Sequence, residues 1–115
     1  MSTATLLHIT SSQPRPGRTV LHIVGEIDAA TVLEFALALE SALAAGPEAV
    51  VLDLSRVGFL GTAGITEITG VAERAASAGV GVRVVVGEGR TVARALEVAG
   101  VPVPTSPDLD HALDS

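Results

Sequence analysis

The sequence contains no cysteine, tryptophan, tyrosine or lysine, and its two aromatic residues are Phe35 and Phe59. Because no disulfide can form, the fold must rest on a hydrophobic core, and the lack of cysteine fits a cytoplasmic protein. With so few aromatic side chains, stacking on bases or sugars is a poor basis for function. Hydrophobic residues make up 48% of the 115 residues, which is enough for one domain over residues 1–115 that needs no metal to fold.

Positive charge is also scarce, since seven arginines stand against 13 acidic residues and the formal net charge is −6. A polyanion such as DNA or RNA would be repelled, and no basic stripe offsets this repulsion, so no nucleic-acid partner is expected. No apolar run reaches the roughly 20 residues of a membrane span. Residues 1–5 lack the positive region and the apolar stretch of a signal peptide. We therefore expect a cytoplasmic protein with no membrane span.

Short apolar segments alternate along the chain with longer segments of helical periodicity. Strands are predicted over residues 6–10, 19–25, 49–54 and 80–86, and residues 101–103 could add a short edge strand. Residues 11–18 contain two prolines and a glycine, which predicts a loop or a hairpin connection. This loop is too short for a crossover helix, so the first two strands are expected to pair antiparallel.

Helices are predicted to begin after Asp28, near Thr62 and at Arg90, with a short fourth helix over residues 108–113. Asp28 is expected to be the N-cap of the first helix, because its carboxylate can accept a bond from a free backbone N–H. The expected buried positions are Val32, Phe35, Leu39 and Leu43 in the first helix, Ile65, Ile68, Ala72, Ala75 and Ala76 in the second, and Val92, Leu96 and Ala99 in the third. The predicted fold class is α/β: a mixed, mostly parallel sheet of four to five strands with an N-terminal antiparallel hairpin, packed against three to four helices.

Three motifs follow one another along the chain: G-E-I-D-A-A-T at residues 25–31, V-V-L-D-L-S at residues 50–55 and G-T-A-G at residues 61–64. They resemble, in this order, the G-E-[LI]-D-x-x-T motif, the central strand and the D-S-[ST]-G motif of STAS domains. Each motif alone is weak evidence, and several in register are strong. The resemblance covers nearly the whole chain and implies a STAS-type fold in a single domain.

Stand-alone STAS domains of this kind resemble bacterial anti-sigma factor antagonists. The resemblance implies a protein that binds an anti-sigma kinase and frees a sigma factor, so that transcription is regulated by partner switching. It also implies that the kinase phosphorylates the hydroxyl of Thr62, which breaks the complex, and that a phosphatase reverses the modification. The chain departs from the family motif at Gly61, which replaces Asp, at Thr62, which replaces Ser, and at Ala63, which replaces a second hydroxyl residue.

The second helix and the turn before it form much of the contact with the kinase in this family. By helical periodicity, Thr66, Glu67, Gly70 and Glu73 fall on the outward side of this helix. Small residues there would allow close approach, and acidic ones could pair with basic residues of the partner. The expected partner-binding residues are Glu26, Asp28, Gly61, Thr62, Ala63, Gly64, Thr66, Glu67, Gly70 and Glu73.

These residues also have structural interpretations. Thr62 could serve only as the N-cap of its helix, and charged residues on an amphipathic helix commonly face solvent. Glu26 and Asp28 could form a carboxylate pair for acid–base or metal chemistry, but no histidine or nucleophile stands near them in the sequence. Asp53, inside an apolar strand, could mark a ligand site at the end of that strand. Hydrogen bonds from Ser55 and nearby N–H groups explain Asp53 better.

The three histidines, His8, His22 and His111, are scattered without metal-ligand spacing, and no Ser-His-Asp order is suggested. The segment G-E-G-R at residues 87–90 is a weak phosphate-loop signal and is interpreted as a turn. We therefore expect no catalytic residues, no metal, no cofactor and no enzyme. Two other functions stay open: an accessory STAS subunit that docks on the ATPase subunit of a membrane transporter, and a non-phosphorylated scaffold in a signalling assembly.

Overall fold

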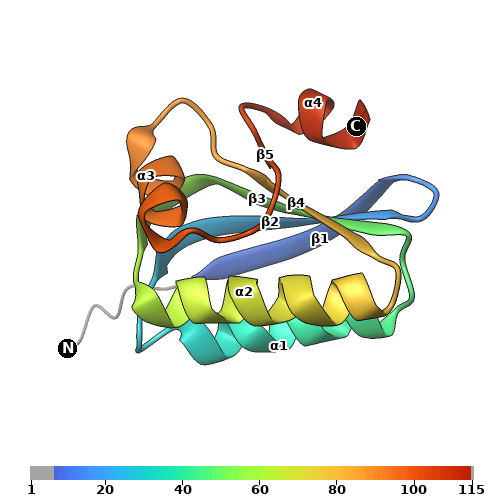
Figure 1. Cartoon of the computed structure of the whole chain (residues 1–115), viewed down its shortest axis with the longest axis horizontal. Coiled ribbons are helices and arrows are strands. Elements are labelled where there is room, and N and C mark those ends of the chain that lie inside the picture. The colour runs from blue at the N-terminus through green and yellow to red at the C-terminus, as the bar shows by residue number, and fades with distance from the viewer. Residues whose placement is uncertain (1–6, 115) are drawn as a thin grey trace.

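A computed structural model describes residues 7–114 and arranges them around a five-stranded sheet with helices on both faces (Figure 1). The elements are β1 His8–Arg15, β2 Arg18–Ile27, α1 Val32–Ala44, β3 Ala49–Leu60, α2 Thr62–Ser77, β4 Gly81–Val85, α3 Arg90–Ala99, β5 Thr105–Ser106 and α4 Leu109–Asp114. The strand order is β1-β2-β3-β4-β5, with β1 antiparallel to β2 and the other neighbours parallel. The predicted α/β class, the opening hairpin and the mostly parallel sheet are confirmed.

The two longest helices lie side by side against one face of the sheet, and α4 lies on the opposite face (Figure 1). Each of these helices, α1 and α2, connects one parallel strand to the next, and crossovers of one hand place both on the same side. The third helix, α3, lies near the end of the sheet where α2 begins (Figure 1). It adds Val92 and Leu96 to the core formed by α1 and α2.

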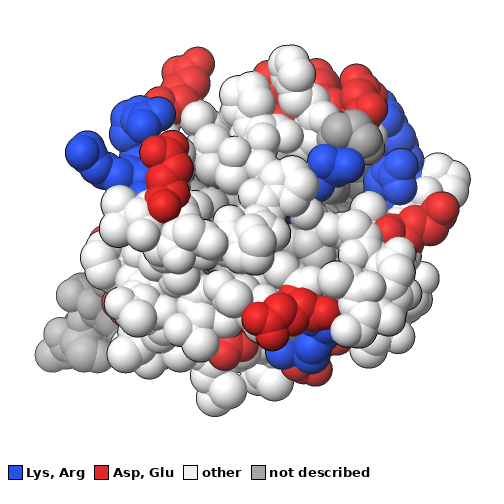
Figure 2. All heavy atoms as spheres, in the orientation of Figure 1, with Lys and Arg blue, Asp and Glu red and all other residues white. Residues whose placement is uncertain are grey.

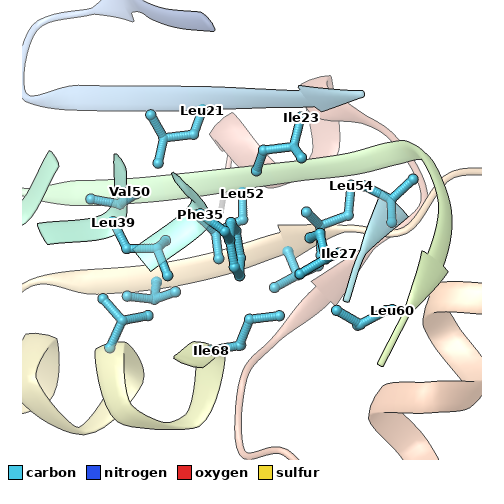
Figure 3. Packing of buried hydrophobic residues seen from close by; sticks show 14 of the residues in the cluster. Leu21, Ile23, Ile27, Phe35, Leu39, Val50, Leu52, Leu54, Leu60 and Ile68 are labelled. Carbon is cyan, nitrogen blue, oxygen red and sulfur yellow. The ribbon is translucent and has the colours of Figure 1, made fainter. Parts of the chain in front are cut away.

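Side-chain alternation along β3 divides its apolar run between the two faces of the sheet. Val50, Leu52 and Leu54 belong to the main core, where they pack with Phe35 and Ile68 from the helices (Figure 3). Phe35 and Ile68 are fully buried. Complete burial of one such side chain contributes about 1.5–3 kcal/mol, so this cluster is the main source of stability on that face.

On the opposite face, α4 covers a smaller cluster that consists of Val20, Val51, Val85, Ala112 and Leu113. Arg15 of β1 holds this helix in place, because its guanidinium donates to the carbonyl of Leu113 at 3.0 Å and pairs with Asp114 at 2.8 Å. Next to the cluster on the same face, His22 and Asp53 remain partly exposed.

The opening hairpin is longer than the sequence predicted. β1 extends to Arg15 and β2 starts at Arg18, so the connection expected over residues 11–18 is limited to Pro16 and Gly17; Leu6, the expected first strand residue, lies outside the described residues. Pro14 is tolerated because β1 is an edge strand. The pairing register also shifts between Ser12 and Arg15, which accommodates the proline.

Two further strand boundaries differ from the prediction. β3 continues to Leu60, where a turn was expected, because its last residues pair with the end of β2. The edge strand expected at residues 101–103 is wrong, since β5 lies at Thr105–Ser106. Prolines on either side of Val103 lack the N–H that a ladder needs, and pairing with β4 starts with the carbonyl of Pro104, which accepts the N–H of Val84 at 3.0 Å.

The helix boundaries were predicted more closely, but some buried positions were not. α3 begins at Arg90 as expected, yet Ala99 is exposed. In α2, Val71 is buried although it was not predicted, and Ala76 is exposed. The buried stripe of α2 follows Ile68, Val71 and Ala75 at spacings of three and four, and Ala76 lies about 100° further round the helix.

Candidate partner-binding site

The start of α2 is open to solvent. Thr62 is the first residue of the helix and is exposed, while Gly61 occupies the N-cap position in an extended conformation (φ −86°, ψ 176°). The N–H of Gly61 donates to the carbonyl of Ile27 at 2.9 Å, which ties this end to β2. No side chain among residues 7–114 caps the helix, so N–H groups of its first turn stay available. The N-cap interpretation of Thr62 is therefore wrong.

The turn before α1 is closed by its own side chains. One carboxylate oxygen of Asp28 accepts the N–H groups of Ala30 at 2.9 Å and Thr31 at 3.1 Å. The Thr31 hydroxyl donates to the carbonyl of Glu26 at 2.7 Å and accepts the N–H of Asp28 at 3.0 Å. Thr31, not Asp28, occupies the N-cap position of α1, so the prediction for Asp28 is corrected: its carboxylate stabilises the turn that precedes the cap.

Gly64 lies inside this site but not on its surface. It is buried, and a Cβ atom built on it would lie 2.5 Å from Ile27 Cγ2 and 2.7 Å from Leu60 Cδ1. Only a residue without a side chain lets the first turn of α2 approach the ends of β2 and β3 this closely. Gly64 was expected to touch a partner, and its burial gives it a positioning role instead.

An exposed aromatic side chain stands beside Gly61, the residue that precedes Thr62. Phe59 keeps 48% of its surface exposed, and a Cβ on Gly61 would lie 2.9 Å from its ring. In the parallel pairing, Phe59 lies opposite Glu26 of β2, which is also exposed. Phe59 was not among the expected partner-binding residues, although it is one of only two aromatic residues in the sequence and lies two positions before the G-T-A-G motif.

The outward side of α2 carries the remaining expected residues. Thr66 and Glu73 are exposed, and Ala63, Glu67 and Gly70 are partly exposed. These residues share one side of the helix with Thr62, as their spacing predicted. We call the exposed set the Thr62 surface, defined by Glu26, Phe59, Thr62, Ala63, Thr66, Glu67, Gly70 and Glu73.

Helix α1 borders this surface with two exposed leucines. Arg74 of α2 pairs with Glu40 of α1 at 3.0 Å, which marks the side of α1 that faces α2. Leu33 and Leu37 precede Glu40 at helical spacing along this side. They are 68% and 61% exposed. Apolar contacts for a partner thus continue from Phe59 and α2 onto α1.

The charges of the surface are mainly acidic. Glu26, Glu67 and Glu73 contribute negative charge, and Asp28 lies partly exposed next to them. Figure 2 shows that charged side chains are sparse over the face where α2 lies, apart from one mixed acidic and basic cluster. A complementary partner would therefore combine an apolar contact area with basic groups at its rim.

The sequence model of the STAS domain matches residues 10–112. The chain is a STAS domain. A comparison with curated protein sequences finds no match.

Solved structures agree with this assignment. An anti-sigma factor antagonist from Mycobacterium paratuberculosis is 29% identical, with a TM-score of 0.84, over 99% of this chain and 97% of that chain. The unphosphorylated form of the anti-sigma factor antagonist SpoIIAA is 14% identical, with a TM-score of 0.73, over 93% of this chain and 96% of its own. The phosphorylated form of SpoIIAA, a Bacillus cell fate determinant, is 16% identical with a TM-score of 0.65, over 93% and 97%. The similarity to SpoIIAA shows a shared fold.

The partly exposed carboxylate of Asp53 has the partners that the sequence favoured. Oδ1 of Asp53 accepts the N–H of Ser55 at 3.1 Å and its hydroxyl at 2.6 Å. The structure adds a contact that was not predicted, because Oδ2 lies 3.2 Å from Nδ1 of His22. In turn, Nε2 of His22 lies 3.1 Å from Oγ of Ser12. These three side chains thus form a hydrogen-bonded row across the face of the sheet away from α1 and α2, which the sequence order did not suggest.

Other kinds of site find less support in the described part of the chain. Within residues 7–114, no group of three or more His, Asp or Glu side chains could hold a metal ion. No described helix is long and apolar enough to cross a membrane. The turn at residues 87–90 ends where α3 begins, as its interpretation as a turn predicted.

Proposed function

We propose that this STAS domain is an anti-sigma factor antagonist that binds an anti-sigma factor of the serine/threonine kinase type through the Thr62 surface. The observation that carries the proposal is the exposed hydroxyl of Thr62 at the uncapped start of α2. The 29% identity to an anti-sigma factor antagonist over almost the full length of both chains supports it. The protein would act in the cytoplasm, where sigma factors act, and by binding rather than by catalysis.

Phe59 is the strongest candidate anchor for the partner. A half-exposed aromatic ring beside small residues can fill a pocket of a partner and exclude water around it. Gly70 and Ala63 leave room for close backbone approach along α2, and Glu67 and Glu73 would meet basic groups at the rim. The exposed leucines of α1 extend the apolar area.

Phosphorylation of Thr62 would switch this contact off. The kinase transfers the γ-phosphoryl group of ATP to Oγ1 of Thr62, the hydroxyl loses its proton and ADP leaves. The phosphate adds a charge of about −1.5 to −2, which the open N-terminus of α2 can accommodate through its free N–H groups. A partner packed on this surface would have to bury that charge beside Glu26, which is unfavourable. A phosphatase that hydrolyses the phosphoester would restore binding.

The test is a quantitative pull-down from the native organism with three baits: the wild type, Gly70→Arg and Asp110→Arg. Gly70 lies on the Thr62 surface, whereas Asp110 is exposed on α4, on the opposite face of the sheet. We expect mass spectrometry to find an anti-sigma factor with a kinase domain bound to the wild type and to Asp110→Arg, and lost with Gly70→Arg. Capture of a transporter ATPase subunit would contradict the proposal, and so would equal recovery with both variants.

A further inference from the structure

Strand β1 forms one edge of the sheet, because β2 is its only neighbouring strand within residues 7–114 (Figure 1). His8 to Ser12 pair with β2 in an unbroken register, so this part of β1 is a regular strand. On its other side, alternate N–H and C=O groups face away from the sheet. Proline and charged residues discourage further pairing at an edge, but in β1 they begin at Pro14. The first five residues of β1 can therefore accept another strand.

A hollow runs beside this edge, between β1, β2 and one side of α1. Its volume is roughly 600 Å³. Helix α1 lines it with Glu34, Ala38 and Ser41, which spacings of four and three place on the same side of the helix. The sheet contributes the apolar side chains of Ile9 and Leu21. Because Ala38 and Ser41 are small, side chains from an additional strand have room between α1 and β1.

A polar group lies in the floor of this hollow. The side chain of Thr19 is on the same face of β2 as Leu21 and is 4% exposed, and its hydroxyl has no hydrogen-bond partner in the described part of the chain. A buried hydroxyl without a partner is unfavourable. The floor therefore offers a donor and acceptor that a polar side chain entering the hollow can satisfy.

The two ends of the hollow differ in charge. Thr19 lies near the start of β2, and the chain returns to this end of the sheet after α1, because Ala49 pairs with Arg18. Glu34, in the first turn of α1, thus lies toward the opposite end. It is exposed and is the only Asp, Glu or Arg among the described residues that line the hollow. Together with the net charge of −6, this favours a basic occupant over a second copy of this acidic chain.

We propose that β1 accepts an extended, basic segment of a partner protein as an additional antiparallel strand. Antiparallel pairing is favoured because it is slightly more stable per residue than parallel pairing. On the face toward α1, the segment places a lysine or arginine near Glu34, an aliphatic side chain beside Ile9 and a glutamine toward Thr19. Its backbone pairs with the open edge, and these alternate side chains give specificity. The site shares no residue with the Thr62 surface, so it adds a second contact to the proposed function.

The first test is an NMR titration of the isotope-labelled full chain with the synthetic peptide acetyl-TQTVTKT-amide. We expect amide shifts over His8 to Ser12 and at Ala38 and Ser41, with contacts between peptide and β1 protons. Two further peptides carry N-methyl groups at either the odd or the even positions. Only one of these sets faces β1, so one peptide should bind at least tenfold more weakly and the other should still bind. No binding, shifts confined to other elements, or equal binding of all three peptides would overturn the proposal.

The second test examines the charge at Glu34. Glu34→Lys repels the lysine of the same peptide, so we expect at least tenfold weaker binding. Glu88→Lys is the matched control, because it makes the same charge change at an exposed position in the turn before α3, and it should bind as the wild type does. Circular dichroism confirms that both variants are folded. Equal affinity of the two variants would overturn the proposal, and so would a dimer of the chain, seen by sedimentation, that the peptide dissociates.

Discussion

Helices α1 and α2 both follow a parallel strand and start at the same end of the sheet, but their first turns are built differently. Before α1, Asp28 and Thr31 exchange hydrogen bonds that satisfy N–H groups of the turn that precedes the helix, while no described side chain caps the helix itself. Before α2, Gly61 passes directly from the strand into the helix, and no described side chain caps it. A closed helix start contributes to stability, whereas an open one leaves N–H groups and the Thr62 hydroxyl for a partner or a phosphate.

The largest expected change in stability comes from placing a side chain beneath the first turn of α2. Gly64→Val would force a side chain against Ile27 and Leu60, and overpacking of this kind costs about 1–3 kcal/mol. Gly70→Ala is the matched control: it lies in the same helix on the partly exposed side, where alanine should stabilise by about 0.5–1 kcal/mol. Urea unfolding measures both. A Gly64→Val variant as stable as the wild type would show that the close approach of α2 to the strand ends is not needed.

A smaller loss is expected at the closed start. Asp28→Ala removes the acceptor of two N–H groups of the turn before α1, and loss of such a hydrogen bond costs about 0.5–1.5 kcal/mol. Glu26→Ala, two residues earlier and exposed, should change the free energy of unfolding by less than about 0.5 kcal/mol. If chemical denaturation found equal effects for the two variants, the Asp28 turn would have no special role.

Thr62→Val sharpens the comparison because it should change stability very little. Valine has nearly the shape of threonine, and the hydroxyl of Thr62 is not needed as a cap, so we expect a change below about 0.5 kcal/mol. Thermal unfolding of Thr62→Val and Asp28→Ala in parallel would show which of the two helix starts contributes more to stability. A loss of stability in Thr62→Val as large as that in Asp28→Ala would contradict the conclusion that Thr62 does not cap α2.

The smallest expected effect concerns a third helix start, that of α4. Asp108 accepts the N–H of His111 at 2.9 Å and lies 2.7 Å from its imidazole. The hydrogen bond to Asp108 and its charge raise the pKa of His111, and the backbone and side-chain hydrogen bonds from His111 lower the pKa of Asp108. In an NMR titration, Asp108→Asn should move the pKa of His111 down toward its ordinary value. An unchanged pKa would show that this pair does not form in solution.

Much of the fold could be predicted because local pattern and tertiary structure agree. The apolar run that ends at Leu54 predicted a strand, and the helix that was expected to begin at Arg90 is α3. The ends of β1 and β3 could not be predicted in this way. Their last residues are strand because a neighbouring strand pairs with them, and such pairing leaves no periodic signal in the sequence.

The candidate sites also could be predicted only where their residues lie close together in the sequence. A contiguous motif located Thr62, and helical spacing located the outward side of α2. Sequence spacing could not reveal the hydrogen-bonded row on the face away from α1 and α2, because Ser12 and His22 are 10 residues apart and His22 and Asp53 are 31 apart. Only the strand order brings these three side chains together. The burial of Gly64 was likewise invisible, since it depends on how α2 rests on the strand ends.

The most direct test of the central claim compares the unmodified protein with protein that carries phosphothreonine at position 62. Each form is used as bait from the native organism, and bound proteins are quantified by mass spectrometry. The account predicts that an anti-sigma factor with a kinase domain binds the unmodified form and is recovered at least tenfold less with the phosphorylated form. Equal recovery with both forms, or no such partner with either, would contradict it.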